Sequence, residues 1–249
     1  MSFSVADESD ESRLSQAILL YKNRSGASFA TVHPIVKDEN NGASIGAGCP
    51  FDEKALKRLA SDLASSLRIK SGILPSNVLS VGGDHIMWWS PPSRRTYFFN
   101  TRQDDAGHNV GNRCGEALTP SLIFVVYRGS MSVFAVKGKT RPDADTPIFH
   151  APLMNVYEDG TLCMGSMSKP NSTLAESISK WEQGFWDSAF SHPNYAKSVN
   201  YKGGLHAFST DLLDGKFRKF PDRVLRPMKI TLQKIVDDLD ADSFSRRRR

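Results

Sequence analysis

The sequence predicts an α+β protein in which an antiparallel meander sheet is flanked by helices. Two hairpin signals support this class, because strand-like segments flank the turns at Arg24-Ser25-Gly26 and Arg128-Gly129. Helical periodicity is confined to stretches before and after the central run of strand-like segments. The expected order is therefore a hairpin, a helix, antiparallel strands, a cysteine-bearing segment and further helices.

The first expected element is the hairpin formed by AILLYKN and ASFATVHPIV. A helix is expected over residues 51–72, with Asp52 as its candidate N-cap and Gly72 at the point where the helix stops. Its apolar residues recur at helical spacing and are Leu56, Leu59, Leu63 and Leu67.

The central part of the chain is rich in residues that favour strands. VLSV, HIMWW and TYFFN are expected to be strands, with an interruption at Pro91-Pro92. Residues 102–118 are polar and rich in glycine, which predicts a loop. SLIFVVY and SMSVFAV then form the second hairpin, and PIFHAP is expected to be a short strand or an extended stretch.

Two helices are expected in the C-terminal part. After the break at Pro170-Asn171, Thr173 and Glu176 have the spacing of a capping box. The apolar face of the helix that follows is formed by Leu174, Ile178, Trp181, Phe185 and Ala189. A final helix is expected from about 227 to 239.

These elements are expected in one domain over residues 13–240, between a disordered acidic N-terminus (1–12) and a disordered basic tail (241–249). No internal repeat is visible. The four arginines Arg246–Arg249 favour a solvated tail. Contact of this tail with nucleic acid or an acidic partner stays open as an accessory role.

The composition is that of a soluble globular domain, with 39% hydrophobic and 24% charged residues and a net charge of +5. The longest apolar run, Leu122–Tyr127, is too short to cross a bilayer, so no membrane association is expected. The acidic N-terminus does not resemble a secretory signal. The three cysteines are far apart and cannot all pair, which fits the reducing cytoplasm of a bacterium.

Several cofactor and metal motifs are missing from the sequence. It contains no CxxC pair, no HExxH and no GxxxxGK[ST] loop. GASIGAG at 42–48 contains GxG but does not join a strand to a helix, and a plain loop is the simpler interpretation. We therefore expect neither a metal site nor a cofactor.

The candidate nucleophile is Cys163, in the stretch NVYEDGTLCMGS. It follows a polar turn and precedes small residues that allow another backbone to approach. Asn155, eight residues upstream, carries an amide that could bind a developing oxyanion, and His192 in FSHPN lies 29 residues downstream. The residues alone leave two interpretations equally open, a nucleophilic thiol or a small buried hydrophobic residue.

The stretch PIFHAPLMNVYEDGTLCMGS resembles the active-site segment of ubiquitin-conjugating (UBC) enzymes. In that superfamily a His-Pro-Asn tripeptide is followed by a turn, a glycine and the thioester-forming cysteine. Asn155, Gly160 and Cys163 match that pattern, whereas Leu153 and Met154 stand where the histidine and proline would be.

A closer resemblance is to a prokaryotic family without this histidine, PRTRC system protein B. It extends from about Ile73 to Asn194 and includes GILPSNVLS, MWWSPPSRRTYFF and WEQGFWDSAFSH. The resemblance implies a UBC-like core with an N-terminal hairpin extension. It also implies a plasmid-borne operon that encodes a ThiF-like activating enzyme, a ubiquitin-like modifier, a JAB-type peptidase and a ParB-like protein.

The chemistry implied by the resemblance is transfer of the modifier through a thioester on Cys163. Asn155 would stabilise the oxyanion, and His192 would act as a base or orient the reacting groups. Two alternatives stay open: a catalytically inactive UBC-like scaffold of the same operon, and a Cys-His hydrolase that uses Cys163 and His192. His150 is expected to pack or to face solvent.

Overall fold

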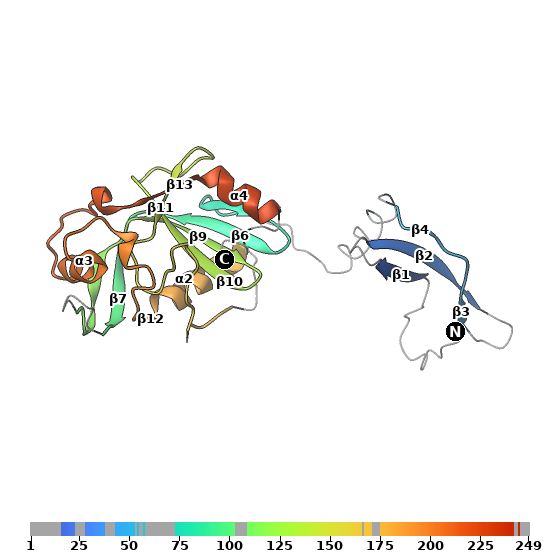
Figure 1. Cartoon of the computed structure of the whole chain (residues 1–249), viewed down its shortest axis with the longest axis horizontal. Helices are drawn as coiled ribbons and strands as arrows, with labels where there is room; N and C mark the ends of the chain where they lie inside the picture. Colours follow the sequence, from blue (N-terminus) through green and yellow to red (C-terminus); the bar gives the residue numbers. More distant parts are fainter. Residues whose placement is uncertain are drawn as a thin grey trace. The chain divides into compact units, whose positions relative to one another are not determined.

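The computed structural model describes residues 16–22, 28–37, 43–52, 54, 57, 73–102, 109–165, 167–170, 175–241 and 244. The chain divides into two compact units, residues 1–72 and 73–249, and each is described by itself (Figure 1). The division lies within the range 13–240, for which the single domain stays a prediction. Apart from isolated positions, the expected helix over 51–72 and the two terminal segments lie outside the described residues.

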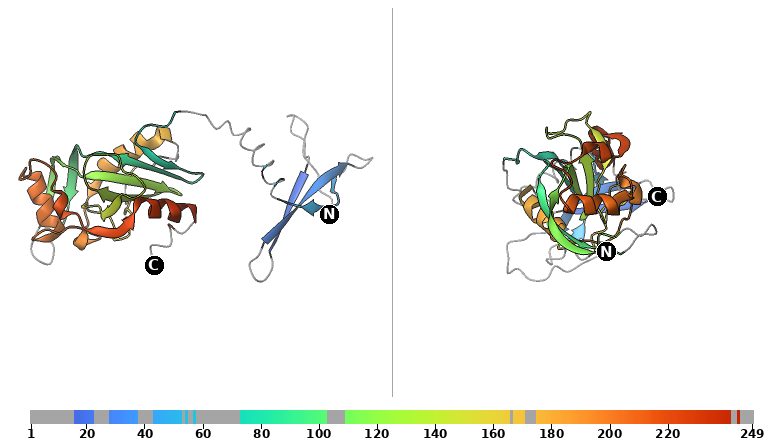
Figure 2. Two further views of the ribbon diagram at one scale, coloured as in Figure 1. Left: turned by 90° about the horizontal axis from the view of Figure 1, so that it is seen from above. Right: turned by 90° about the vertical axis from the view of Figure 1, so that its left-hand side faces the viewer.

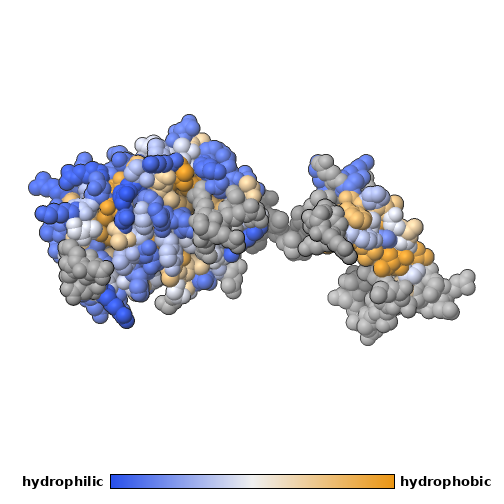
Figure 3. All heavy atoms as spheres, in the orientation of Figure 1, coloured by the Kyte–Doolittle hydropathy of each residue, from blue (hydrophilic) through white to orange (hydrophobic). Residues whose placement is uncertain are grey.

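The first unit contains a small antiparallel sheet in the order β1-β2-β3, with β4 paired to β2. Its strands are β1 (Gln16–Lys22), β2 (Ser28–Lys37), β3 (Ala43–Ile45) and β4 (Cys49–Pro50). The pairing of β1 with β2 confirms the first predicted hairpin. Several large apolar side chains of this sheet are exposed, among them Leu20 and Phe29. Hydrophobic surface is visible on this unit in Figure 3.

The second unit is organised around a six-stranded antiparallel sheet in the order β13-β11-β10-β9-β6-β5. Its strands are β5 (Val78–Val81), β6 (His85–Ser90), β9 (Ser121–Tyr127), β10 (Ser130–Val136), β11 (Pro147–His150) and β13 (Pro227–Thr231). Arg128 and Gly129 both have positive φ, as a tight two-residue turn requires, and the second predicted hairpin is confirmed.

A second sheet in the order β12-β7-β8 consists of β12 (Ala189–Phe190), β7 (Arg94–Asn100) and β8 (Asn112–Leu118). The predicted loop over 102–118 is therefore wrong for its second half, while 103–108 lie outside the described residues. β8 is an edge strand that buries only Ala117 fully, and its pairing with β7 outweighs its weak strand propensity.

The helices are α2 (Ile178–Trp186), α3 (Gly204–Leu213) and α4 (Leu232–Asp240), with short 3₁₀ turns at Ala175–Ser177, Ala196–Ser198 and Asp222–Val224. Two predictions need correction. α2 ends before Ala189, which belongs to β12, and the final helix begins only at Leu232 because 227–231 pair with β11 as β13. α3 was not predicted. None of these helices is long and apolar enough to span a membrane.

The six-stranded sheet is covered on both faces, since α2 and α4 lie on opposite sides of it (Figures 1 and 2). Alternate residues of β9 enter two separate cores. Leu122, Phe124 and Val126 pack in the core that contains Trp181 and Phe185 of α2. Ile123, Val125 and Tyr127 pack in the core that contains Leu232, Ile235 and Leu239 of α4. Each fully buried side chain of this size contributes about 1.5–3 kcal/mol to the stability of the fold. The predicted α+β class is confirmed.

Candidate functional site

Residues 155–163 form a tight hairpin that ends at Cys163. The two arms meet at the bridge between Val156 and Leu162. In the turn, the backbone N–H of Tyr157 donates to the carbonyl of Thr161 at 2.8 Å, and the Thr161 N–H donates to the Asp159 carboxylate at 2.8 Å. The polar turn seen in the sequence thus reverses the chain and returns Cys163 to the level of Asn155.

The hairpin is fixed to the first half of β10. The Val133 N–H donates to the Gly160 carbonyl at 2.8 Å, and the Leu162 N–H donates to the Met131 carbonyl at 2.9 Å. Gly160 has φ +87°, and a Cβ at this position would lie 2.2 Å from the ring of Phe134. Only glycine fits both the conformation and the space, so the turn and the sheet are locked together.

Asn155 joins this hairpin to the segment that follows α2. Its side-chain Nδ2 donates to the Ala189 carbonyl at 2.7 Å. Its Oδ1 accepts from the backbone N–H groups of Ser191 at 3.1 Å and His192 at 3.0 Å. Its own backbone N–H donates to the His192 carbonyl at 2.6 Å. The residue has φ +65°, a left-handed conformation that asparagine adopts more readily than most residues.

The backbones of Cys163 and His192 are both hydrogen-bonded to the main chain of Asn155. The Cys163 N–H donates to the Asn155 carbonyl at 2.7 Å, while the Asn155 N–H binds His192 as described above. Both residues are exposed. The imidazole Nδ1 of His192 lies 2.8 Å from the Ser191 hydroxyl. α2 ends at Trp186, so His192 lies six residues beyond the end of this helix.

The amide of Asn155 is poorly placed for the oxyanion role that the sequence suggested. The residue is only 8% exposed, and its amide is engaged by Ala189, Ser191 and His192. This geometry favours a positioning role. Ser191 lies in the same group of residues but was not predicted. The only indication of it in the sequence was its place directly before His192.

The chain after Cys163 is anchored to α2. Met167 is buried, and its N–H donates to the Met164 carbonyl at 2.7 Å. A Cβ at Gly184 of α2 would lie 2.3 Å from the Ser168 carbonyl oxygen, so the helix and this segment are in close backbone contact. The exposed thiol thus lies between two fixed segments.

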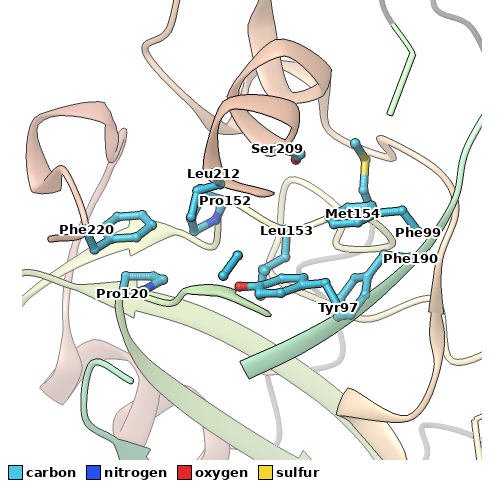
Figure 4. Close-up of a pocket in the computed structure, with 11 residues that line it drawn as sticks. Tyr97, Phe99, Pro120, Pro152, Leu153, Met154, Phe190, Ser209, Leu212 and Phe220 are labelled. Atoms are coloured by element: carbon cyan, nitrogen blue, oxygen red, sulfur yellow. The ribbon is translucent and has the colours of Figure 1, made fainter. Parts of the chain in front are cut away.

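Leu153 and Met154, the two residues that precede Asn155, are core residues. Both are almost fully buried and line an apolar pocket with aromatic residues of the second sheet, including Tyr97 and Phe190 (Figure 4). Burial raises the pKa of the Tyr97 hydroxyl, which points into this pocket. Apolar packing therefore holds the entry to the hairpin.

An open groove runs along the outer side of the hairpin. It is lined by Tyr157, Glu158, Asp159, Tyr195, Met228 and Lys234, among others. Among the described residues, no group of three or more His, Cys, Asp or Glu side chains is placed to hold a metal ion.

His150 packs beside this groove, with its ring 4.8 Å from that of Tyr195. Burial lowers the pKa of His150, an effect that Arg226 reinforces and Glu158 opposes. The unfolded chain therefore binds a proton more readily than the folded protein, and the free energy of unfolding should fall as the pH drops through the ordinary imidazole range.

We expect this fall between about pH 7.5 and 5.5 to be smaller in a His150→Phe variant, which keeps a ring against Tyr195 but cannot be protonated. Urea unfolding at several pH values measures the difference between the two proteins. Parallel pH dependences would contradict the burial of a neutral imidazole.

A family model for prokaryotic E2 family D matches residues 55–228, more than two thirds of the chain. The chain belongs to prokaryotic E2 family D. No curated protein and no solved structure matches it. The matched range of this family D protein includes the whole hairpin, Cys163, Asn155 and His192, and membership supports a function of the ubiquitin-conjugating type.

Proposed function

We propose that this family D protein accepts a ubiquitin-like modifier as a thioester on Cys163 and transfers it to a target. The observation that supports the proposal most is the exposed thiol at the end of a hairpin that is hydrogen-bonded both to β10 and, through Asn155, to the His192 segment. A thiol that exchanges acyl groups with another protein must be accessible, and it must be held in a fixed orientation.

The proposed reaction has two steps. In the first, the Cys163 thiolate attacks the carbonyl carbon of the modifier's thioester on an activating enzyme, a new C–S bond forms, and the activating enzyme's thiolate leaves. In the second, an amine of the target attacks the same carbon, a C–N bond forms, and the Cys163 thiolate leaves. The proton lost by the amine passes to the imidazole of His192, which acts as a general base.

The proposed partners are those implied by the resemblance to PRTRC system protein B. They are a ThiF-like activating enzyme and a ubiquitin-like modifier, with a JAB-type peptidase and a ParB-like protein in the same operon, in the bacterial cytoplasm. In this proposal Asn155 is a positioning residue, because its amide holds the His192 segment against the hairpin.

Purified protein incubated with the activating enzyme, the modifier and ATP tests the function on a non-reducing gel. We expect an adduct with the added mass of the modifier that disappears with reductant. Cys163→Ala should abolish the adduct completely. Cys114→Ala is the matched control, because Cys114 is also exposed but lies on β8, and its adduct should equal that of the wild type.

If the activating enzyme carries the modifier but the wild-type protein forms no adduct with it, the scaffold alternative is favoured. The exposure of Cys163 speaks against that alternative, because a cysteine that serves only in packing is expected to be buried. The hydrolase alternative is disfavoured as well, since Cys163 does not lie at a helix N-terminus, a position that lowers the pKa of a thiol.

A further inference from the structure

The hydroxyl of Ser191 lies between His192 and Asn155. Its Oγ is 2.8 Å from Nδ1 of His192 and 3.1 Å from Oδ1 of Asn155. A serine hydroxyl has one proton to donate and lone pairs to accept. The direction of the two hydrogen bonds therefore determines which nitrogen of His192 carries the proton in its neutral form.

The orientation of the Asn155 amide decides this direction. Nδ2 must face the Ala189 carbonyl, and Oδ1 must face the backbone N–H groups of Ser191 and His192, so the amide cannot be flipped without losing three hydrogen bonds. Oδ1 can only accept. The Ser191 hydroxyl therefore donates its proton to Oδ1, which leaves an oxygen lone pair facing Nδ1 of His192.

We propose that Ser191 is a positioning residue that holds neutral His192 in the tautomer with the proton on Nδ1. Nδ1–H then donates to the Ser191 oxygen, and the lone pair of Nε2 is left facing outward. In the opposite tautomer the hydroxyl would have to donate to Nδ1, and its oxygen would face Oδ1 at 3.1 Å without a proton between them.

This tautomer is the one that a general base at the thioester requires, and this part of the inference rests on the proposed function. As the amine of the target attacks the thioester carbon, the C–N bond forms, the C–S bond to Cys163 breaks, and the amine proton goes to Nε2. The imidazolium that results shares its Nδ1 proton with Ser191, and it returns the Nε2 proton to solvent.

The tautomer is measured by long-range ¹H–¹⁵N correlation NMR of the full chain at about pH 8.5, well above the ordinary titration range of an imidazole. The His192 signals are assigned by their loss in His192→Asn. We expect a protonated Nδ1 and an unprotonated Nε2 in the wild type and in Ser191→Thr, and loss of this preference in Ser191→Ala. Ser188→Ala is the matched control, because the Ser188 hydroxyl binds the Phe185 carbonyl instead.

A wild type with its proton on Nε2, or a Ser191→Ala variant with an unchanged tautomer, would overturn the assignment. This measurement needs neither activating enzyme nor modifier, so its result is independent of whether Cys163 forms a thioester. Once the thioester on Cys163 has been prepared, the rate of its discharge to free lysine should fall about tenfold in Ser191→Ala and stay unchanged in Ser191→Thr and Ser188→Ala. An unchanged discharge rate in Ser191→Ala would overturn the role of the tautomer in the reaction.

Discussion

A Gly160→Ala substitution is expected to lower the free energy of unfolding by about 2 to 5 kcal/mol. Two costs add at this position. A left-handed conformation costs a non-glycine residue about 1–2 kcal/mol, and Gly160 has φ +87°. The new methyl group would also lie 2.2 Å from the ring of Phe134, and overpacking of this kind costs about 1–3 kcal/mol. Urea unfolding of the two proteins measures the sum.

Gly138→Ala separates the two costs. Gly138 has φ +80°, but nothing lies within 4 Å of the position that its Cβ would take. This variant should therefore lose only the conformational part, about 1–2 kcal/mol. Equal losses of unfolding free energy in the two variants would show that Gly160 does not lie against the ring of Phe134 as described. Because Gly160 and Leu162 fix the hairpin to β10, Gly160→Ala should also reduce adduct formation on Cys163, whereas Gly138→Ala should not.

Asn155→Ala is expected to destabilise the protein by about 3 to 5 kcal/mol. The substitution removes the amide from a site that is 8% exposed, and it leaves the N–H groups of Ser191 and His192 and the Ala189 carbonyl without their partner. These hydrogen bonds are partly buried, and each contributes about 0.5–1.5 kcal/mol net to stability. Alanine must also adopt φ +65°, which adds about 1 kcal/mol.

Asn155→Gly is the matched variant, since glycine tolerates the positive φ but lacks the amide. We expect it to be about 1 kcal/mol more stable than Asn155→Ala and still well below the wild type. Hydrogen exchange locates the effect, because protection should be lost first at the amides of Ser191 and His192. A change in the free energy of unfolding below about 0.5 kcal/mol in Asn155→Ala would contradict the role of this residue as the link between the two segments.

Local sequence signals predicted the strands of the second unit that have strong propensity or clear turns. The turn at Arg128-Gly129 and the apolar runs of β9 and β10 are examples, since all their side chains but Ser130 are buried and the signal is continuous. β8 was missed because its pairing with β7 compensates for a polar sequence. The start of the final helix was placed too early because Met228 has the helical spacing but lies in β13, which pairs with β11.

The residues of the candidate site were predicted from their spacing in the sequence, and the contacts between them could not be predicted in this way. Asn155 and Cys163 could be found together because a hairpin brings residues eight apart into register. The position of His192 could not be derived, since it depends on where α2 ends and on the hydrogen bonds that the Asn155 amide makes with 189–192. The same long-range contacts explain why Ser191 went unnoticed. A side chain acquires such a role only when two segments distant in sequence meet.

Because helices cover the central sheet on both faces, the face beneath α4 stays uncovered during part of the synthesis of the chain. The fully buried sheet residues of the core beneath α4 are all present once Ile148 has been added, but Leu232, Ile235 and Leu239 follow only about 80 residues later. At about 5–20 residues per second, ribosomes need roughly 4 to 17 seconds for that stretch. Throughout this interval the nascent chain presents a bare apolar sheet face, and a chaperone that binds such surfaces is expected to be its first partner in the cell.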